Sequence, residues 1–164
     1  MKNKDLFDEY AKDILENELF LETKKIYSHG RISIYEHSIA VAELAFSMIE
    51  NNNGIDKRCV VRAALLHDFF LYEWHVPGIR YIMHGWKHPS IAAKKAKEIF
   101  GISRKEYACI KTHMWPWTPF SIPICREAWI ISMADKVVAL KETVFCRGKR
   151  APLHGALRHA PPTA

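Results

Sequence analysis

Six side chains of this sequence have the chemistry of metal ligands: His37, His67, Asp68, His88, His113 and Asp135. The doublet in "LLHDFF" is the most demanding, because a buried imidazole beside a buried carboxylate is costly unless both have partners. Any one of the histidines alone is most simply a hydrogen-bonded core residue. Six such groups meeting without a metal would leave several unsatisfied. Imidazole nitrogens and carboxylate oxygens together suit a first-row divalent metal.

The spacing of apolar residues is helical nearly throughout and predicts the elements that bring these side chains together. Ser33 is followed three residues later by Glu36, a capping box that opens a helix with His37 on its apolar face. A further helix is expected from about residue 57 to residue 70, with His67 on its inward stripe. Both histidines should therefore face the core.

Residues 73–89 are expected to be loop-like because of Pro77, Gly78 and Gly85. Pro89 suits the first turn of the next helix, which would put His88 at the N-terminal edge of that helix. Gly101 is expected to end it.

The remaining two candidates belong to the last two predicted helices. Ser103 and Glu106 form a second capping box, which opens a helix ending near His113. The final helix is expected over residues 124–145, where Asp135 interrupts an apolar stripe. The six candidates thus come from five helices, which predicts an all-α fold: a compact bundle with the ligands at its centre and no sheet beyond a stray hairpin.

The composition fits one globular domain, predicted over residues 1–146, with a basic, proline-containing and poorly ordered tail over 147–164. Apolar residues make up 49% of the chain and charged residues 26%, which is typical of soluble proteins. No apolar run approaches the roughly 20 residues that span a membrane, and no apolar signal core is present at the start. The four cysteines show no C-x-x-C pairing and are expected to be reduced thiols in a cytoplasmic protein.

Charge is distributed unevenly along the chain. Residues 1–56 hold six Lys/Arg and 11 Asp/Glu, whereas residues 57–164 hold 18 and seven. A basic half suits a small anionic phosphorylated ligand, although a solvated surface explains it equally well. A nucleic-acid polymer is not expected as a partner, because no recognition helix or arginine-rich stripe is evident outside the tail.

The ordered set of ligands resembles the HD-domain metal-dependent phosphohydrolase superfamily. The motifs read "YEHS", "LLHDF", "GWKHPSIAAKKA", "IKTHM" and "SMADKV", and the resemblance runs from about Arg31 to Thr143. The arrangement with two additional histidines is similar to the two-metal branch, which includes diadenosine polyphosphate hydrolases and cyclic-dinucleotide phosphodiesterases. Bacterial proteins described only as HD-domain proteins are also similar.

The resemblance implies a role for each ligand. His37, His67, Asp68 and Asp135 would hold one metal, and His88 and His113 would hold a second, with Asp68 bridging. Iron or manganese is the expected pair of divalent metals, with magnesium, cobalt, nickel or zinc as alternatives. A hydroxide activated by the metals and oriented by Asp68 would then attack the phosphorus of a small nucleotide-like phosphate ester or anhydride.

One position departs from the pattern of the superfamily. Many of these phosphohydrolases read His-Asp-x-x-Lys, with the lysine near the substrate phosphate, whereas here that position is Leu71. Arg31 or Lys136 could supply the base instead, although either could equally be a surface residue. His84 is a candidate acid/base or extra ligand, with a loop histidine as the plainer interpretation.

Two other classes of function stay open. The missing lysine keeps a di-iron oxygenase of the same superfamily as an alternative, and a metal-binding signalling module without turnover is another. Four tryptophans near the ligands, Trp74, Trp86, Trp115 and Trp117, could stack on a nucleobase, but packing against the core is favoured.

Overall fold

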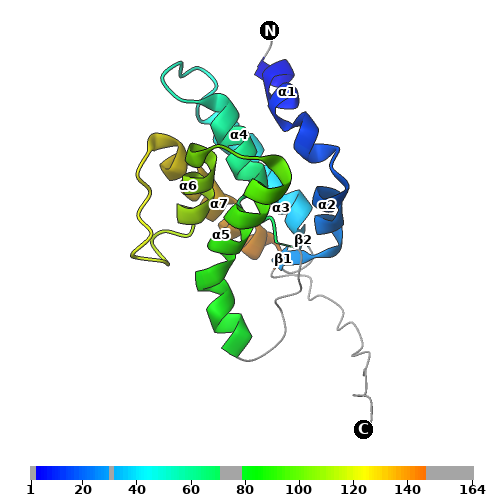
Figure 1. Cartoon of the computed structure of the whole chain (residues 1–164), viewed down its shortest axis with the longest axis vertical. Coiled ribbons are helices and arrows are strands. Elements are labelled where there is room, and N and C mark those ends of the chain that lie inside the picture. The colour runs from blue at the N-terminus through cyan, green and yellow to red at the C-terminus, as the bar shows by residue number, and fades with distance from the viewer. Residues whose placement is uncertain (1–2, 30–31, 71–78, 147–164) are drawn as a thin grey trace.

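The computed structural model describes residues 3–29, 32–70 and 79–146 of the chain, and this part is built mainly from helices (Figure 1). In chain order the elements are α1 (Asn3–Leu15), α2 (Glu18–Leu21), the 3-10 turn η1 (Glu22–Lys25), β1 (Tyr27–His29), β2 (Ile32–Ser33), α3 (Ile34–Ser47), α4 (Lys57–Leu66), α5 (Ile79–Phe100), α6 (Arg104–Thr112) and α7 (Arg126–Cys146). The prediction of an all-α fold with at most a hairpin is confirmed. The predicted tail, residues 147–164, lies outside the described residues.

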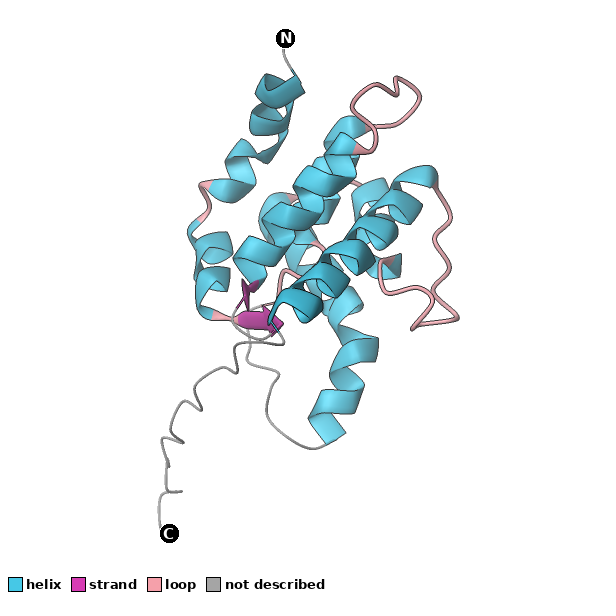
Figure 2. Cartoon of the chain, turned by 180° about the vertical axis from the view of Figure 1, so that it is seen from behind, coloured by secondary structure: helices cyan, strands magenta, loops and turns pink. Residues whose placement is uncertain are grey.

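The two strands form a short antiparallel pair at one edge of the helical body (Figure 2). Tyr27 pairs with Ser33, and His29 pairs with Ile32. The second strand leads directly into α3, so this pair sets where α3 begins.

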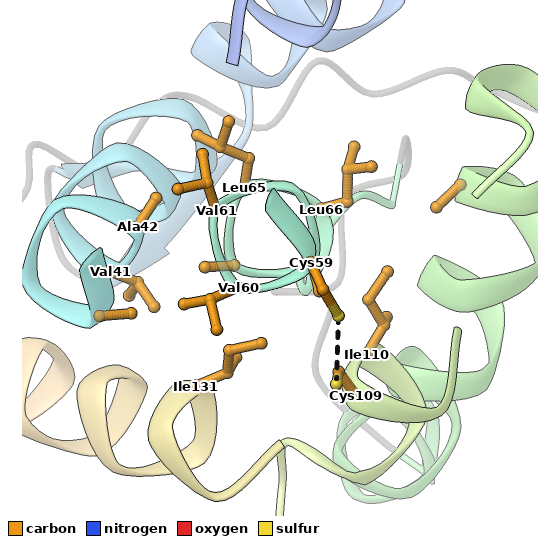
Figure 3. Packing of buried hydrophobic residues seen from close by; sticks show 14 of the residues in the cluster. Val41, Ala42, Cys59, Val60, Val61, Leu65, Leu66, Cys109, Ile110 and Ile131 are labelled. Carbon is orange, nitrogen blue, oxygen red and sulfur yellow. Dashed lines mark hydrogen bonds between the residues drawn. The ribbon is translucent and has the colours of Figure 1, made fainter. Parts of the chain in front are cut away.

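Helix α4 is the centre of the core. Every residue from Cys59 to Leu66 is buried, and α1, α3, α6 and α7 all pack against this helix. Figure 3 looks along α4 and shows Val41 of α3, Ile110 of α6 and Ile131 of α7 arranged around it. A helix covered on all sides is the expected outcome for a segment that is apolar nearly all round.

Arg62 is the charged exception within the buried part of α4. Its Nε donates to Glu106 Oε1 at 3.1 Å, and its Nη1 also contacts Asp13. A buried guanidinium is tolerated when carboxylates pair with it in this way. The pairing also ties α4 to α1 and α6.

Both predicted capping boxes are present. Ser33 Oγ accepts from the Glu36 N–H at 3.2 Å while Glu36 Oε2 accepts from the Ser33 N–H at 2.9 Å. Ser103 and Glu106 repeat the arrangement at the start of α6. Each box satisfies N–H groups that have no partner within the helix. The starts of α3 and α6 therefore lie where the sequence predicts them.

Gly101 ends α5 with a φ of +59°. Glycine adopts this left-handed conformation without the steric penalty that a Cβ brings. This confirms the predicted end of the helix.

The prediction of a loop over residues 73–89 is wrong for its second part, because α5 already begins at Ile79 and contains Pro89 in its interior. An internal proline removes the hydrogen bond to the carbonyl four residues earlier, that of Gly85, and its ring crowds that carbonyl. The helix nevertheless continues on both sides of Pro89. His88 consequently lies inside a long helix and not at its edge. The first half of α5 extends away from the other helices (Figures 1 and 2).

Two other boundaries differ slightly from expectation. The helix predicted to reach residue 70 ends at Leu66, because His67 takes the C-cap position. The last helix runs from Arg126 to Cys146, close to the predicted 124–145.

Packing of the tryptophans is only partly confirmed. The rings of Trp115 and Trp129 meet edge to face with their centroids 4.6 Å apart, whereas Trp86 and Trp117 are 56% and 72% exposed. For these two residues the packing interpretation is wrong. Trp74 lies outside the described residues.

The three cysteines with described side chains, Cys59, Cys109 and Cys125, are free thiols, as expected. The Sγ of Cys109 lies 4.0 Å from that of Cys59 (Figure 3) and 3.8 Å from that of Cys125. Among the helices of the described ranges, none is both long enough and apolar enough to span a membrane.

Candidate metal centre

The six predicted ligands converge on one buried cluster. His37 belongs to the first turn of α3, His67 and Asp68 follow α4, His88 lies in α5, His113 follows α6, and Asp135 lies in α7. The imidazole rings form a continuous row. Ring centroids are 5.3 Å apart for His37 and His67, 4.9 Å for His67 and His113, and 5.1 Å for His88 and His113.

Two of the histidines are positioned by helix ends. His67 and His113 are the C-cap residues of α4 and α6, both with right-handed helical backbone angles. The Nδ1 of His67 lies 2.7 Å from the Ala64 carbonyl oxygen, and that of His113 lies 2.8 Å from the Ile110 carbonyl oxygen. Carbonyl groups in the last turn of a helix lack the usual partner four residues later, so they can accept from the rings. The Nε2 atom of each ring is thereby directed into the cluster.

Asp68 is held by the two phenylalanines that follow it. Phe69 is fully buried and packs edge to face on Phe100, with ring centroids 5.5 Å apart. Phe70 is also buried and meets the ring of His88 at 6.0 Å. These contacts fix the turn that carries the carboxylate.

The carboxylate of Asp68 lies among three imidazoles. Its Oδ1 is 3.3 Å from His88 Nε2 and 3.6 Å from His113 Nε2, and its Oδ2 is 3.7 Å from His67 Nε2. Burial alone would raise the pKa of Asp68, but the charge of His67 and the proximity of His88 and His113 hold it well below its ordinary value. The carboxylate is therefore ionised, as a metal ligand must be.

His37, Asp135 and Glu142 form what we call the α3–α7 end of the cluster. His37 Nε2 lies 3.2 Å from Asp135 Oδ1, and His37 Nδ1 lies 2.8 Å from Glu142 Oε2. Burial alone would lower the pKa of His37, yet the hydrogen bonds with Asp135 and Glu142 raise it to about 10. Burial alone would raise the pKa of Asp135, but its hydrogen bond with His37 and the nearby charge of His67, whose Nε2 lies 3.6 Å from Asp135 Oδ1, hold it well below its ordinary value.

His88 and His113 form the opposite, α5–α6 end. Burial, with the nearby charge of His67, lowers the pKa of His113 to about 3, so its ring is neutral. Its Nδ1–H donates to the Ile110 carbonyl, which leaves a lone pair on Nε2. The Nε2 of His88 lies 3.1 Å from that atom. In the absence of a metal, a hydrogen bond between the two Nε2 atoms therefore needs the Nε2–H of His88 as its donor.

The cluster contains polar atoms whose bonding is incomplete. Among the described residues, His67 Nε2 and Asp68 Oδ1 are buried and have no hydrogen-bond partner. Unsatisfied buried atoms of this kind are rare and costly unless a ligand completes them. Both atoms point to a cation at this position.

Three overlapping sets of ligand atoms each lie within 4.8 Å of one another: His37, His67 and Asp68; His67, His113 and Asp135; and Asp68, His88 and His113. Each set combines imidazole nitrogen with carboxylate oxygen, which suits a divalent first-row metal. The residues of the cluster therefore fit a metal site.

Of the other predicted site residues, only Lys136 is within the described side chains. Its Nζ donates to the His113 carbonyl oxygen at 2.7 Å and lies 3.3 Å from Asp135 Oδ2. It thus joins α7 to the end of α6 beside the cluster, and it remains partly exposed. Arg31 and the side chain of His84 lie outside the described part of the chain.

Sequence reasoning missed Glu142. Its position carried a signal, because it follows Asp135 by seven residues, which is two helical turns on the same face. A glutamate near the end of a helix is commonly a surface residue, however, so its partner could be found only from the three-dimensional arrangement.

The sequence of the chain was compared with known protein families. Residues 34–140 match the HD domain family, and this span includes all six ligands. The chain therefore belongs to the HD domain family, a superfamily of metal-dependent phosphohydrolases. No curated protein and no solved structure matched the chain.

Proposed function

We propose that this protein is a phosphohydrolase that uses two divalent metals to cleave a small nucleotide-like phosphate ester or anhydride. The observation that carries the proposal is the pair of buried, unsatisfied atoms at the middle of the cluster, His67 Nε2 and Asp68 Oδ1. Membership of the HD domain family supports the same chemistry.

Asp68 is the proposed bridging ligand. Its carboxylate belongs to a set with His37 and His67 and to another set with His88 and His113. Asp135 would complete the first position, since its Oδ1 approaches both His37 and His67. Iron or manganese suits such an imidazole-rich site. When bound, the metals supply the acidification of water and the neutralisation of phosphoryl charge on which hydrolysis depends.

The protein's own groups have separate tasks in this mechanism. The turn held by Phe69 and Phe70 keeps the Asp68 carboxylate in place, where its second oxygen can orient the attacking water. Lys136 is the proposed contact for a substrate phosphate. Two acceptors engage its ammonium group, His113 O and Asp135 Oδ2, and an ammonium has a third N–H to donate. Arg31 and His84 remain further candidates from the sequence.

The proposal is tested by turnover of a generic phosphodiester and of a nucleotide panel by metal-stripped protein reloaded with Mn²⁺. Hydrolysis is expected with Mn²⁺ and is expected to vanish in Asp68→Asn. Glu127→Gln is the matched control, since Glu127 is a buried carboxylate of α7 that pairs with Lys105 outside the cluster. Equal turnover by Asp68→Asn and wild type would contradict the assignment.

A di-iron oxygenase is the second candidate, and Leu71 favours it, because the superfamily's phosphate-binding lysine is absent at that position. Oxygen consumption by the iron-loaded protein, without phosphate release from any substrate, would support this alternative. Tight metal binding without either activity would instead indicate a signalling module.

A further inference from the structure

His37 differs from the other two histidines whose Nδ1 contacts are described. The Nδ1 atoms of His67 and His113 donate to neutral main-chain carbonyls, whereas that of His37 faces the carboxylate of Glu142. We propose that Glu142 is a positioning residue that sets the metal affinity of the α3–α7 end by holding His37 through its Nδ1 atom. This inference rests on the proposed function.

The contact is short and shielded from water. His37 Nδ1 and Glu142 Oε2 are 2.8 Å apart, and the side chains of the two residues are 1% and 9% exposed. Glu142 lies two helical turns beyond Asp135 on α7, so one rigid helix carries both a proposed ligand and the group that orients another. With Nδ1 held, the ring can present only Nε2 to Asp135 and the cluster.

A carboxylate partner also changes the ring itself. Donation of Nδ1–H to an anion increases the electron density at Nε2 and makes that nitrogen a stronger ligand. Charge-assisted hydrogen bonds are about twice as strong as neutral ones. His37 should therefore bind its metal more tightly than an imidazole held by a carbonyl, and loss of the anion should weaken this end selectively.

The other side of Glu142 is not tightly enclosed. The residue lines a groove between α3 and α7 together with Ala40, Leu44 and Val138. A glutamine of the same size can occupy this place without a clash, and an alanine would leave a space that water can enter. Both variants should therefore keep the fold.

The experiment is a titration of metal-stripped protein with Mn²⁺ in competition with a chelating indicator. Glu142→Ala should weaken binding at the α3–α7 end by about 10–100-fold, as expected for loss of a carboxylate that supports a ligand histidine. Glu142→Gln keeps an acceptor oxygen but not the charge, so its loss of affinity should be smaller. Binding at the α5–α6 end should change little in either variant, because His88 and His113 do not contact Glu142 in the described structure.

Glu127→Gln separates positioning from general stability. It removes a buried charge from the same helix, so it should lower the melting temperature of the metal-free protein while leaving the Mn²⁺ affinity at the wild-type value. Wild-type affinity in both Glu142 variants would overturn the inference and leave the proposed function intact. Absence of Mn²⁺ binding by the wild type itself would overturn both.

Discussion

The two ends of the metal centre bury imidazole in opposite ways. At the α3–α7 end, His37 lies between the carboxylates of Asp135 and Glu142, and its pKa is raised to about 10. At the α5–α6 end, His113 donates to a main-chain carbonyl, and burial lowers its pKa to about 3. One row of touching rings therefore holds a cationic histidine and a neutral one. Nearby carboxylates, more than the partner of Nδ1, decide the direction of the shift: the Nδ1–H of His67 also donates to a main-chain carbonyl, and burial alone would lower its pKa, yet Asp68 and Asp135 raise it.

The difference has a consequence for metal binding. A neutral imidazole can accept a cation directly, whereas a protonated one must first lose its proton. His113 is therefore ready to bind a metal at neutral pH, whereas His37 binds in exchange for its proton. Asp68 lies between them and is ionised in either case.

The largest effect is expected from removing the group that both ends share. Asp68→Ala should lose metal from both positions, because Asp68 belongs to the ligand set of each end and Asp135 cannot replace a carboxylate shared by two ions. Elemental analysis should show metal falling from two ions per chain to almost none, and hydrolysis should fall to background. Undiminished metal in this variant would show that Asp68 does not bridge the two ends.

The next largest effect is a difference in stability between variants of His67, at the centre of the row of imidazole rings, and of His113, at its α5–α6 end. His67 is fully buried between helices, so His67→Ala creates a hole and damages the site at once. His113 is equally buried, but it faces Asp68 whereas His67 faces both Asp68 and Asp135, so His113→Ala should empty the second position at a smaller cost in stability. Because ions that bind only the folded state stabilise it, the metal-loaded melting temperature should fall by about 5–10 °C more in His67→Ala.

Thermal melts with and without chelator measure this difference, and hydrolysis assays accompany them. Both variants should be inactive. Equal melting temperatures with retained activity in His113→Ala would show that the α5–α6 end does not take part in the mechanism.

A smaller effect concerns the protons displaced by metal. His37 has a folded-state pKa of about 10, so it is protonated at pH 7, and the pKa of His67 is raised as well. Mn²⁺ binding at this end should therefore release at least one proton. The affinity of this end should therefore rise with pH up to about 10, by nearly tenfold per pH unit where a single proton is displaced. Calorimetry in buffers of different ionisation enthalpy counts the protons. Proton release when Mn²⁺ binds His88 and His113, with none when it binds the α3–α7 end, would show that the two ends have the opposite protonation states.

The smallest effect lies outside the centre and serves as a reference for it. Burial alone would raise the pKa of Glu127, but its hydrogen bonds with Lys105 and the Asp56 N–H lower it to about 2. Because its pKa is lowered, the Glu127 carboxylate stabilises the fold fully at pH values above its ordinary pKa of 4.5. This stabilisation is lost as the pH falls towards 2. Because Lys105 is half-exposed and its charge is screened, the contribution is no more than about 1 kcal/mol.

Glu127→Gln should accordingly flatten the decline in stability between pH 4.5 and 2 without affecting the centre. Urea unfolding at several pH values tests this. An unchanged acid dependence would show that the ion pair with Lys105 contributes nothing measurable.

The sequence predicted most of the helices because their start signals are local. Each capping box joins residues three positions apart, so Ser33 with Glu36 and Ser103 with Glu106 could be recognised without knowledge of the fold. The end of α4 and the start of α5 were less predictable. The cap at His67 depends on a ring that is held inside the cluster, and α5 continues through Pro89 although an internal proline disfavours a helix.

The centre itself was predictable only as a set of residue types. Helical spacing placed His37 and Asp135 on inward faces, and the fold brings all six candidates together as expected. Spacing could not reveal the bond between His37 and Glu142, because it joins residues 105 positions apart. Nor could it reveal that Lys136 donates to the carbonyl of His113. Contacts of this kind depend on how α3, α6 and α7 pack, which local sequence does not specify.

The most direct test of a shared two-metal centre is to follow hydrolysis of a phosphodiester while metal-stripped protein is titrated with Mn²⁺. Filling one position should give little turnover, and activity should rise as the second ion binds per chain, since both ends are needed around Asp68. Full activity after one equivalent, or binding of two equivalents with no hydrolysis of any phosphate ester or anhydride, would contradict this account.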